Sequence, residues 1–545
     1  MVLLVATVLF LSAPEAAYTQ TYYVDSVAGD DANPGNTEVV PWKTTRRLNM
    51  KEFAAGDVIL FKRGSEWFSA VINVASGDLT FGAYGDGPPP RLVGSMAVTF
   101  DQFQQREDGI YYRVFPRPHA QKDWTNWGVQ LVMESGNVFY KKVQALNELT
   151  GKGQFYYDKI STNLYIRPLD PVSSLTQTIY VGQQENIFEI KHAQINNLVI
   201  RDLEISLANR YGVGPWYQGD KVTQGNVLIE NNTFLGNAFS AVCLSGFMSY
   251  DRIVIRGNII RMSGAEGIYI GKFAASSALE IVDNHIGDPK DNSFGWAGEG
   301  PNSAFNGDGI DVKNGNRGVI IARNTIRHLT SGSGGICSHS SGLIVDNIIQ
   351  DVSLPGTIWT NPPTGVFVDI DDRNTVTSIK NNTISALNSA GIVVRGNGTL
   401  HPPLLIEDND ITLAAANPNA QIIFTAMNSQ NVKIVGNKCR GGAYGLALAP
   451  VDYSPVGFLV EKNEFLNTSK SPFYFSQYGP EQLKGLVMSS NRVCKNVPVI
   501  IEWKGRVSDK TIEDAKKVLG AESLLEISCP ETILPAGSFS GVQVR

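Results

Sequence analysis

The sequence predicts an all-β fold, a right-handed parallel β-helix in which short strands stack coil upon coil. Three observations predict this class: a repeated strand motif, an asparagine at one fixed offset in each copy, and a composition rich in glycine (53) and poor in methionine (8). Long helical periodicities are nearly absent. We therefore expect a β-solenoid whose main part spans roughly residues 190–500.

The repeat consists of apolar-x-apolar, two polar residues, Asn, one further residue and an apolar residue. Its clearest copies include VLIENNTF, IVIRGNII, LEIVDNHI, VIIARNTI, LLIEDNDI and VKIVGNKC. The repeated asparagines are Asn232, Asn258, Asn284, Asn324, Asn347, Asn382, Asn409, Asn437, Asn463 and Asn491. Alternating apolar residues mark a half-buried strand, and Asn both tolerates a left-handed corner and hydrogen-bonds to stacked copies of itself. Most spacings are 26–28 residues, which suits three short strands per coil with coils about 4.8 Å apart.

The chain divides into four parts. Residues 1–17 are predicted to be a signal peptide, because a short apolar run precedes small residues. Residues 18–190 would form an N-terminal cap and the first coils with an inserted β element, and residues 191–505 the repeats. Residues 506–545 would form a C-terminal cap and tail, with helical spacing over 508–519 that stops at Gly520. We expect a secreted or periplasmic monomer with no membrane segment in the mature chain.

Charge and cysteine content narrow the function. The net charge is −6 and no block rich in Lys and Arg is present, which argues against nucleic-acid binding. The five cysteines are odd in number and far apart, so they predict neither a disulfide framework nor a metal-type pair. A bond between Cys494 and Cys529 is one interpretation, but buried free thiols are preferred.

A second strand in each coil carries the candidate site. Its copies are EGIYIGK (266–272), DGIDVKN (308–314), GGICSHS (334–340), TGVFVDIDD (364–372) and AGIVVRGN (390–397). Alternate residues of a strand face opposite sides, so Ile268/Ile270, Ile310/Val312, Ile336/Ser338, Val366/Val368 and Ile392/Val394 should face the core. One outward column then holds Tyr269, Asp311, Cys337, Phe367 and Val393, and the next holds Lys313, His339, Asp369 and Arg395. Charge concentrated in consecutive coils predicts a functional site there.

Two long intervals between the repeated asparagines point to the same place. The extra residues lie at 287–306 and 353–363, just before charged strands. Insertions in repeat proteins tend to decorate the binding face. Each insertion carries a tryptophan, Trp296 and Trp359, which either binds a sugar ring or simply anchors its own loop. An open cleft between the insertions would suit an extended glycan.

The repeat and several N-terminal segments resemble the pectate, alginate and chondroitin lyases and the glycoside hydrolases that share a pectin-lyase-like β-helix. These segments are YYVDSVAGDDANPGN (22–36), GDVILFKRGSEW (56–67) and GQFYYDKISTNLYIRP (153–168). The resemblance implies a secreted protein that acts on polysaccharides. It is much less specific for chemistry, because this fold carries many reactions.

The leading hypothesis is a lyase that cleaves an acidic, uronate-containing polysaccharide by β-elimination. Such an enzyme must neutralise the uronate carboxylate, remove the C5 proton and protonate the leaving oxygen. Lys313 lies one coil from His339, with the substrate-binding candidates Arg395 and Arg373 nearby. Neighbouring cations often lower the pKa of such a base. The aspartates that offer oxygen ligands for Ca²⁺ are Asp308, Asp311, Asp369, Asp371 and Asp372.

Residues 308–339 also resemble the alginate lyase and chondroitinase B family. By position, this resemblance implies that Lys313 is the base and that Asp308 is a calcium ligand. It also places His339 where the family has an arginine that serves as the acid. The family's second acidic ligand and its Asn ligand have no clear match here.

Two other functions stay open. One is a glycoside hydrolase that uses two carboxylates. Asp311 and Asp369 are two coils apart, about 10 Å or more, whereas Asp308 lies closer to Asp311 and Asp371 lies closer to Asp369. Glu266 and Glu299 are further candidates. The other is a non-catalytic glycan-binding solenoid, which predicts aromatic and hydroxyl side chains along the groove.

Overall fold

A computed structural model describes residues 19–529 of the 545-residue chain, with some internal segments left out. These segments are 76–77, 116–127, 136–137, 171–173, 192–195, 216–221, 246–247, 272–274, 288–306, 330–333, 341, 353–363, 371–377, 387–388, 397–403, 426–429, 449–454, 477–482, 484, 495–496, 504–508, 510 and 521. The predicted signal peptide therefore lies outside the described residues. No described helix is long and apolar enough to cross a membrane.

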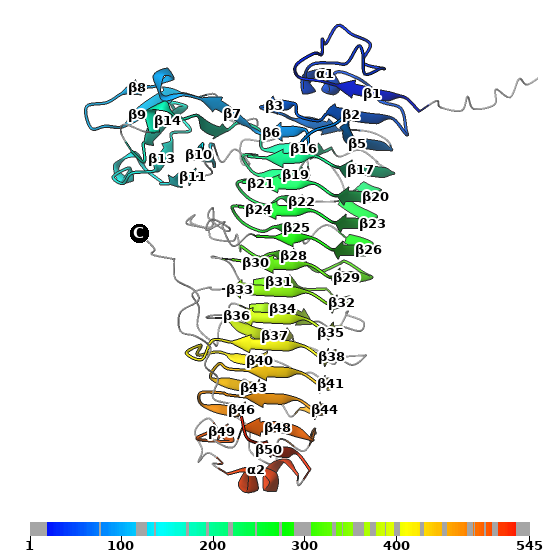
Figure 1. Ribbon diagram of the computed structural model, residues 1–545, viewed down its shortest axis with the longest axis vertical. Coiled ribbons are helices and arrows are strands. Elements are labelled where there is room, and N and C mark those ends of the chain that lie inside the picture. The colour runs from blue at the N-terminus through cyan, green and yellow to red at the C-terminus, as the bar shows by residue number, and fades with distance from the viewer. Residues whose placement is uncertain are drawn as a thin grey trace, which may run out of the picture.

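Three long parallel sheets run the length of the molecule and form a β-helix, as predicted (Figure 1). Sheet A contains β1 (Thr21–Val24), β2 (Val58–Lys62), β5 (Leu79–Tyr84), β17 (Asn197–Arg201), β20 (Val222–Glu230), β23 (Met248–Arg256), β26 (Ala275–Val282), β29 (Val319–Ala322), β32 (Gly342–Val345), β35 (Ser378–Lys380), β38 (Leu404–Glu407), β41 (Gln430–Val435), β44 (Val456–Glu461) and β47 (Leu486–Ser489).

Sheet B contains β3 (Glu66–Phe68), β6 (Arg91–Val93), β18 (Glu204–Ser206), β21 (Thr233–Leu235), β24 (Ile259–Arg261), β27 (His285–Ile286), β30 (Thr325–Arg327), β33 (Ile348–Val352), β36 (Thr383–Ala386), β39 (Asp410–Leu413), β42 (Lys438–Arg440), β45 (Glu464–Leu466), β48 (Asn491–Cys494) and β50 (Leu524–Ile527). Sheet C contains β4 (Ile72–Val74), β16 (Asn186–Ile190), β19 (Tyr211–Pro215), β22 (Val242–Leu244), β25 (Ile268–Ile270), β28 (Ile310–Val312), β31 (Gly334–Ser338), β34 (Thr364–Ile370), β37 (Ala390–Gly396), β40 (Ala420–Thr425), β43 (Tyr444–Leu448), β46 (Ser471–Phe475) and β49 (Ile501–Trp503).

Each coil runs through sheets A, B and C in turn, and its inward side chains join one apolar core that extends along the whole solenoid. The core-facing residues predicted in sheet C are buried, from Ile268 and Ile270 to Ile392 and Val394. The same sheets begin earlier than residue 190, because β1 to β6 already belong to them. A short helix, α1 (Thr45–Asn49), lies among these first coils.

The repeated asparagines form a continuous buried ladder, as the sequence predicts. From Asn232 to Asn491, each Nδ2 donates to the Oδ1 of the asparagine in the next coil, at 2.8–3.2 Å. Each Nδ2 also donates to a main-chain carbonyl, as from Asn232 to Ile200 at 2.9 Å. The ladder is extended at one end by Leu203, which stands in the asparagine position and whose N–H donates to Asn232 Oδ1.

The left-handed corner lies one residue before the ladder, which corrects the prediction. The residues that directly precede the ladder positions all have φ between +53° and +69°, whereas no ladder asparagine has a positive φ. These residues are Asp202, Asn231, Gly257, Asp283, Arg323, Asp346, Asn381, Asp408, Gly436, Lys462 and Ser490. The ladder residue therefore supplies side-chain hydrogen bonds and its predecessor makes the turn.

Replacing Asn437 by Ala should destabilise the protein by about 2–4 kcal/mol, because buried donors lose their acceptor. Asn437 Oδ1 accepts from the N–H and Nδ2 of Asn409 at 3.0 and 2.8 Å, and its Nδ2 donates to Ile406 O at 2.8 Å. Urea unfolding measures the loss. The exposed Lys433→Ala of the same coil should stay within about 0.5 kcal/mol of the wild type, and an equal effect of both variants would contradict the ladder's role.

A β module is inserted within a coil, between β6 of sheet B and β16 of sheet C. Its strands are β7 (Ser95–Val98), β8 (Gln104–Gln105), β9 (Tyr111–Val114), β10 (Val132–Glu134), β11 (Val138–Phe139), β12 (Lys141–Lys142), β13 (Gln154–Tyr157), β14 (Asn163–Arg167) and β15 (Ile179–Gly182), in sheets ordered β11-β10-β15-β7 and β12-β13-β14-β9-β8. The module has its own apolar core. Through Leu131 and Met133 it also packs on Phe239 and Cys243 of the solenoid, and Tyr269 borders this contact.

The C-terminal end of the solenoid is covered by α2 (Ile512–Leu519), which confirms the predicted helix (Figure 1). Its N-cap is Thr511, whose hydroxyl accepts from Asp514 N at 3.1 Å, and it ends at Gly520. The strand after it, β50, pairs with β48. This pairing brings Cys529 to Cys494, and the two form a disulfide. The preference for free thiols was therefore wrong for this pair and right for Cys243, Cys337 and Cys439, which are free and buried.

Candidate active site

The predicted columns exist on the outer face of sheet C. In register, Tyr269 pairs with Asp311, Asp311 with Cys337, and Cys337 with Phe367. In the next column, Asp369 pairs with Arg395. Strand pairing therefore gathers acidic, basic and thiol groups from paired positions 26–42 residues apart in the sequence.

A glycine at the start of each strand permits this arrangement. A Cβ at Gly309 would lie 2.6 Å from Gly335 O and 2.7 Å from a methyl carbon of Ile326. Only glycine fits such a close approach of two coils. Gly309 lies between Asp308 and Asp311 in the sequence, so this close approach of the coils helps to position both aspartates.

The ammonium group of Lys313 contacts two neighbouring side chains. Its Nζ lies 2.7 Å from Asp311 Oδ2 and 3.4 Å from His339 Nε2. Burial alone would lower the pKa of Lys313, but the Asp311 carboxylate outweighs it and the pKa is raised. The lowered pKa expected of a lysine base is therefore not found, because the nearest charge is a carboxylate rather than another cation. The role of Lys313 as a base stays a prediction.

His339 and Arg395 are both held by Asp369. Asp369 Oδ2 lies 3.2 Å from His339 Nδ1 and 2.9 Å from an Arg395 terminal nitrogen, and the Arg395 guanidinium lies 4.9 Å from the ring centre of Phe367. Partial burial opposes ionisation of Asp369, but these two partners lower its pKa to about 2. Asp369 thus remains a carboxylate at ordinary pH, which excludes it as a proton donor. It also does not pair with Asp311, since the side chains of Lys313 and His339 lie between them.

Three carboxyl groups from two neighbouring coils interact through their charges. Burial raises the pKa of Glu266 to about 7, and the nearby Asp311 adds to the shift. Burial, reinforced by Asp311 and Glu266, raises the pKa of Asp308 well above its ordinary value. Burial also raises the pKa of Asp311, but Lys313 opposes it directly. Burial thus raises the pKa of all three groups, and Asp311 is the one whose carboxylate a cation contacts directly.

Hydrogen bonds fix two of these groups. Ser240 Oγ donates to Glu266 Oε2 at 2.9 Å, and the N–H of Gly334 donates to Asp308 Oδ1 at 2.6 Å. Asp308 is fully buried, whereas Glu266 retains 5% of its surface. Glu266 is therefore the better placed of the two to reach a bound molecule.

The structure brings together most of the predicted site residues that it describes: Lys313, His339, Asp311, Asp369, Arg395 and Asp308. Tyr269 faces the same side but packs toward the inserted module. Trp296, Trp359, Arg373, Asp371 and Asp372 lie outside the described residues. Cys337 was placed in the column without a role, although it lies 3.4 Å from His339 Nε2.

Calcium, implied by the lyase resemblance, receives little support from the described side chains. Ca²⁺ prefers six to eight oxygen ligands. Among the described residues, the ligand atoms of Asp311, Cys337 and His339 converge. Only one of these three side chains, the Asp311 carboxylate, offers oxygen, whereas the other two offer a thiol and an imidazole. Asp308 does not belong to that group, so its role as a calcium ligand stays a prediction.

Comparison with known proteins supports the fold and points to carbohydrate-active proteins. A family model described as a right handed beta helix region matches residues 364–515. The fold is a right-handed parallel β-helix. The lacto-N-biosidase of Bifidobacterium longum subsp. longum is 25% identical over 378 residues, which cover 64% of this chain and 21% of that protein. The chain thus spans about a fifth of the length of this curated relative.

Solved structures with low similarity include a complex of XylC with xylose and a GH136 lacto-N-biosidase from Eubacterium ramulus. The first has 13% identity and a TM-score of 0.48, covering 90% of this chain and 85% of that one. The second has 13% identity and a TM-score of 0.29, covering 93% of this chain and 67% of that one.

Proposed function

We propose that this protein is a glycoside hydrolase that acts on a neutral glycan bound across the outer face of sheet C. The observation that carries the proposal is the group of carboxyls Glu266, Asp308 and Asp311, together with the contact between Asp311 and Lys313. Glu266 is the general acid, and Asp311 is the carboxylate that acts as base or nucleophile.

This assignment follows from what glycoside hydrolysis requires. One carboxylic acid must protonate the leaving oxygen, while a second, ionised carboxylate activates water or attacks the sugar. Glu266 is buried beside another negative charge, which favours its protonated form. The ammonium of Lys313 lies 2.7 Å from Asp311 and favours the ionised form of that carboxylate.

The same geometry weighs against the lyase hypothesis. A uronate lyase needs a cation to neutralise the substrate carboxylate and a base to remove the C5 proton. Among the described residues of the site, both Lys313 and Arg395 already contact a carboxylate. Neither cation can therefore neutralise a substrate carboxylate without giving up the contact it already makes.

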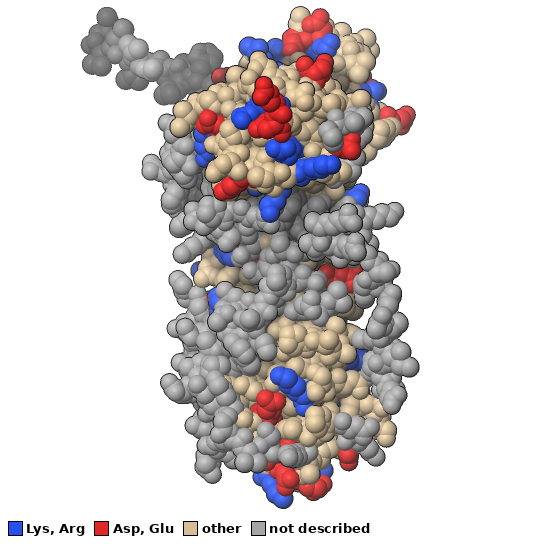
Figure 2. All heavy atoms as spheres, turned by 90° about the vertical axis from the view of Figure 1, so that its left-hand side faces the viewer, with Lys and Arg blue, Asp and Glu red and all other residues tan. Residues whose placement is uncertain are grey.

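Two further findings support the proposal. The curated relative is named a lacto-N-biosidase, which is the name of a glycosidase and not of a lyase. On the face shown in Figure 2, the described Lys, Arg, Asp and Glu residues are intermixed over the N-terminal part and form no broad basic surface. On that part of the surface, such a charge distribution favours binding of neither a polyanionic glycan nor a nucleic acid.

Incubating the purified protein with neutral oligosaccharides and polysaccharides, and separately with alginate, pectate and chondroitin, tests the proposal. We expect new reducing ends from a neutral glycan without absorbance from unsaturated uronides. Absorbance from unsaturated products would contradict the hydrolase and restore the lyase hypothesis. Binding of glycans without any cleavage would instead support a binding solenoid.

A further inference from the structure

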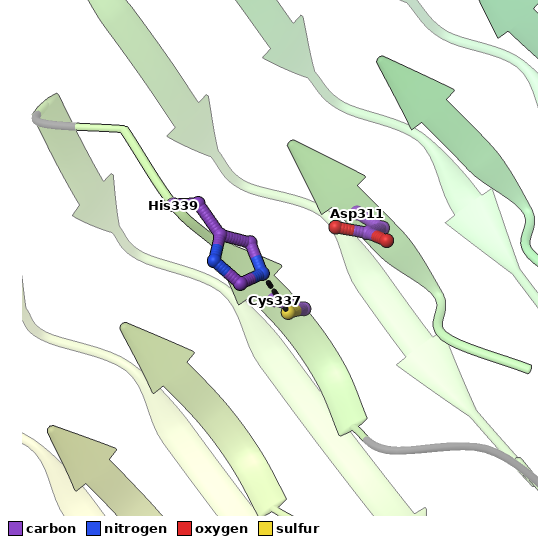
Figure 3. A group of neighbouring side chains, drawn as sticks. All are labelled: Asp311, Cys337 and His339. Atoms are coloured by element: carbon purple, nitrogen blue, oxygen red, sulfur yellow. Dashed lines mark hydrogen bonds between the residues drawn. The ribbon is translucent and has the colours of Figure 1, made fainter. Parts of the chain in front are cut away.

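Asp311, Cys337 and His339 bring three metal-binding atoms together on neighbouring strands. A carboxylate oxygen, the thiol sulfur and an imidazole nitrogen all lie within 4.8 Å of one another. Figure 3 shows the His339 ring, just after the end of β31, pointing toward Cys337 of that strand, with the Asp311 carboxylate on the adjacent strand β28. Oxygen, sulfur and nitrogen donors in one cluster match the ligands of Zn²⁺.

The surroundings of these three side chains are those expected around a metal ligand. Asp369 contacts His339 Nδ1 at 3.2 Å. A carboxylate on that nitrogen orients the other ring nitrogen, Nε2, toward Cys337, as second partners of zinc-bound histidines do. In addition, Asp311 Oδ1 is buried and has no hydrogen-bond partner among the described residues, although a buried oxygen is normally satisfied.

In this structure the ammonium of Lys313 supplies the positive charge beside the Asp311 and His339 side chains. Its Nζ contacts Asp311 Oδ2 at 2.7 Å and His339 Nε2 at 3.4 Å. The lysine side chain is 24% exposed and directly follows the short strand β28, so it can turn outward toward solvent. The position beneath it then becomes reachable for an ion.

We propose that Asp311, Cys337 and His339 form a Zn²⁺ site that opens when Lys313 swings away. The thiol loses its proton to solvent on binding, and a water completes the tetrahedral set that Zn²⁺ prefers. The metal and the Lys313 ammonium compete for one position. This consequence rests on the proposed function: a bound ion occupies the Asp311 carboxylate, which then cannot act as base or nucleophile, so Zn²⁺ inhibits the enzyme.

Calorimetric titration of the chelator-treated full-length protein with ZnCl₂ tests the site. We expect one equivalent to bind, with affinity falling at least ~100-fold in Cys337→Ser and ~10–100-fold in Asp369→Asn, the usual effect of losing a second-sphere partner. His328→Ala, which removes a histidine bound to Asp351 elsewhere, is the matched control and should leave the affinity unchanged. Equal affinity of the wild type and Cys337→Ser would overturn the proposal.

A gain-of-binding variant removes the ambiguity of folding defects. Lys313→Met eliminates the competing ammonium and should tighten Zn²⁺ binding at least ~10-fold. Co²⁺ should give a thiolate-to-metal absorption band in this variant and in Cys243→Ser, but not in Cys337→Ser. Absence of both tighter binding and the band would overturn the site.

Activity assays separate this proposal from the proposed function. Zn²⁺ binding without inhibition would contradict the role of Asp311 in catalysis while leaving the metal site intact. Absence of Zn²⁺ binding would overturn the metal site while leaving the hydrolase proposal intact.

Discussion

Replacing Asp311 by Asn is expected to lower kcat for glycan hydrolysis by about 10³-fold, within the range of a positioned catalytic carboxylate. The substitution keeps the shape of the side chain but removes the charge that Lys313 holds at 2.7 Å. KM should change far less than kcat, because the carboxylate acts on the reacting bond rather than on remote parts of the substrate. Steady-state kinetics on the cleaved glycan measure both.

The matched control is Asp283→Asn. Asp283 also lies on the solenoid but is exposed and pairs with Arg323 at 2.8 Å, away from the site. It should retain wild-type kcat, and its stability should change by less than about 1 kcal/mol. Full activity of Asp311→Asn, in protein shown to be folded by its urea midpoint, would remove Asp311 from the mechanism.

The β-helix itself could be predicted from the sequence because its determinants are local and repeated. Alternating apolar residues and one asparagine per coil set both the strands and the register, and the ladder from Asn232 to Asn491 follows from them. The left-handed corner was misplaced by one residue, since Gly and Asn also occur often at the preceding position, as in Gly257 and Asn231. The Cys494–Cys529 bond depends on β50 joining sheet B, a long-range pairing that no local pattern shows.

The location of the site could also be predicted, whereas the roles within it could not. The register placed Lys313, His339, Asp369 and Arg395 in one column. Protonation, however, depends on which group each side chain contacts. The sequence spacing did not show that the Lys313 ammonium contacts the Asp311 carboxylate, a contact that raises the lysine pKa instead of lowering it.

Glu266 also shows why the roles were missed. Its position before a core strand looks like that of any turn residue, and only the fold shows that it is buried beside Asp308 and Asp311. The single signal in the sequence was that an acidic residue precedes the glycine in two successive copies, EGIYIGK and DGIDVKN.

Replacing Glu266 by Gln is expected to lower kcat by about 10²–10⁴-fold, the usual contribution of a general acid. In the wild type, activity should fall as pH rises through about 7, because the acid form of Glu266 is lost there. Burial is the main cause of this raised pKa, Asp311 adds to it, and the hydroxyl of Ser240 and the ammonium of Lys313 oppose it. The residual activity of the variant should lack this fall, and pH-rate profiles of the two proteins measure the difference. The control is Glu280→Gln, which changes a partly exposed glutamate that pairs with Arg252. This variant should keep the wild-type pH-rate profile.

The same substitution should stabilise the protein at high pH, which distinguishes a buried acid from an ordinary surface carboxylate. The pKa of Glu266 is raised from 4.5 to about 7 in the folded state, so the folded protein binds this proton more tightly than the unfolded chain. Its contribution to stability is complete below about pH 4.5 and is lost as pH rises through 7, up to about 3 kcal/mol. Glutamine stays neutral and avoids that loss. Urea unfolding should therefore show Glu266→Gln close to the wild type at pH 4.5 and more stable at pH 8. A variant that is less active but no more stable at pH 8 would mean that Glu266 is already ionised in the folded protein and is not the proton donor.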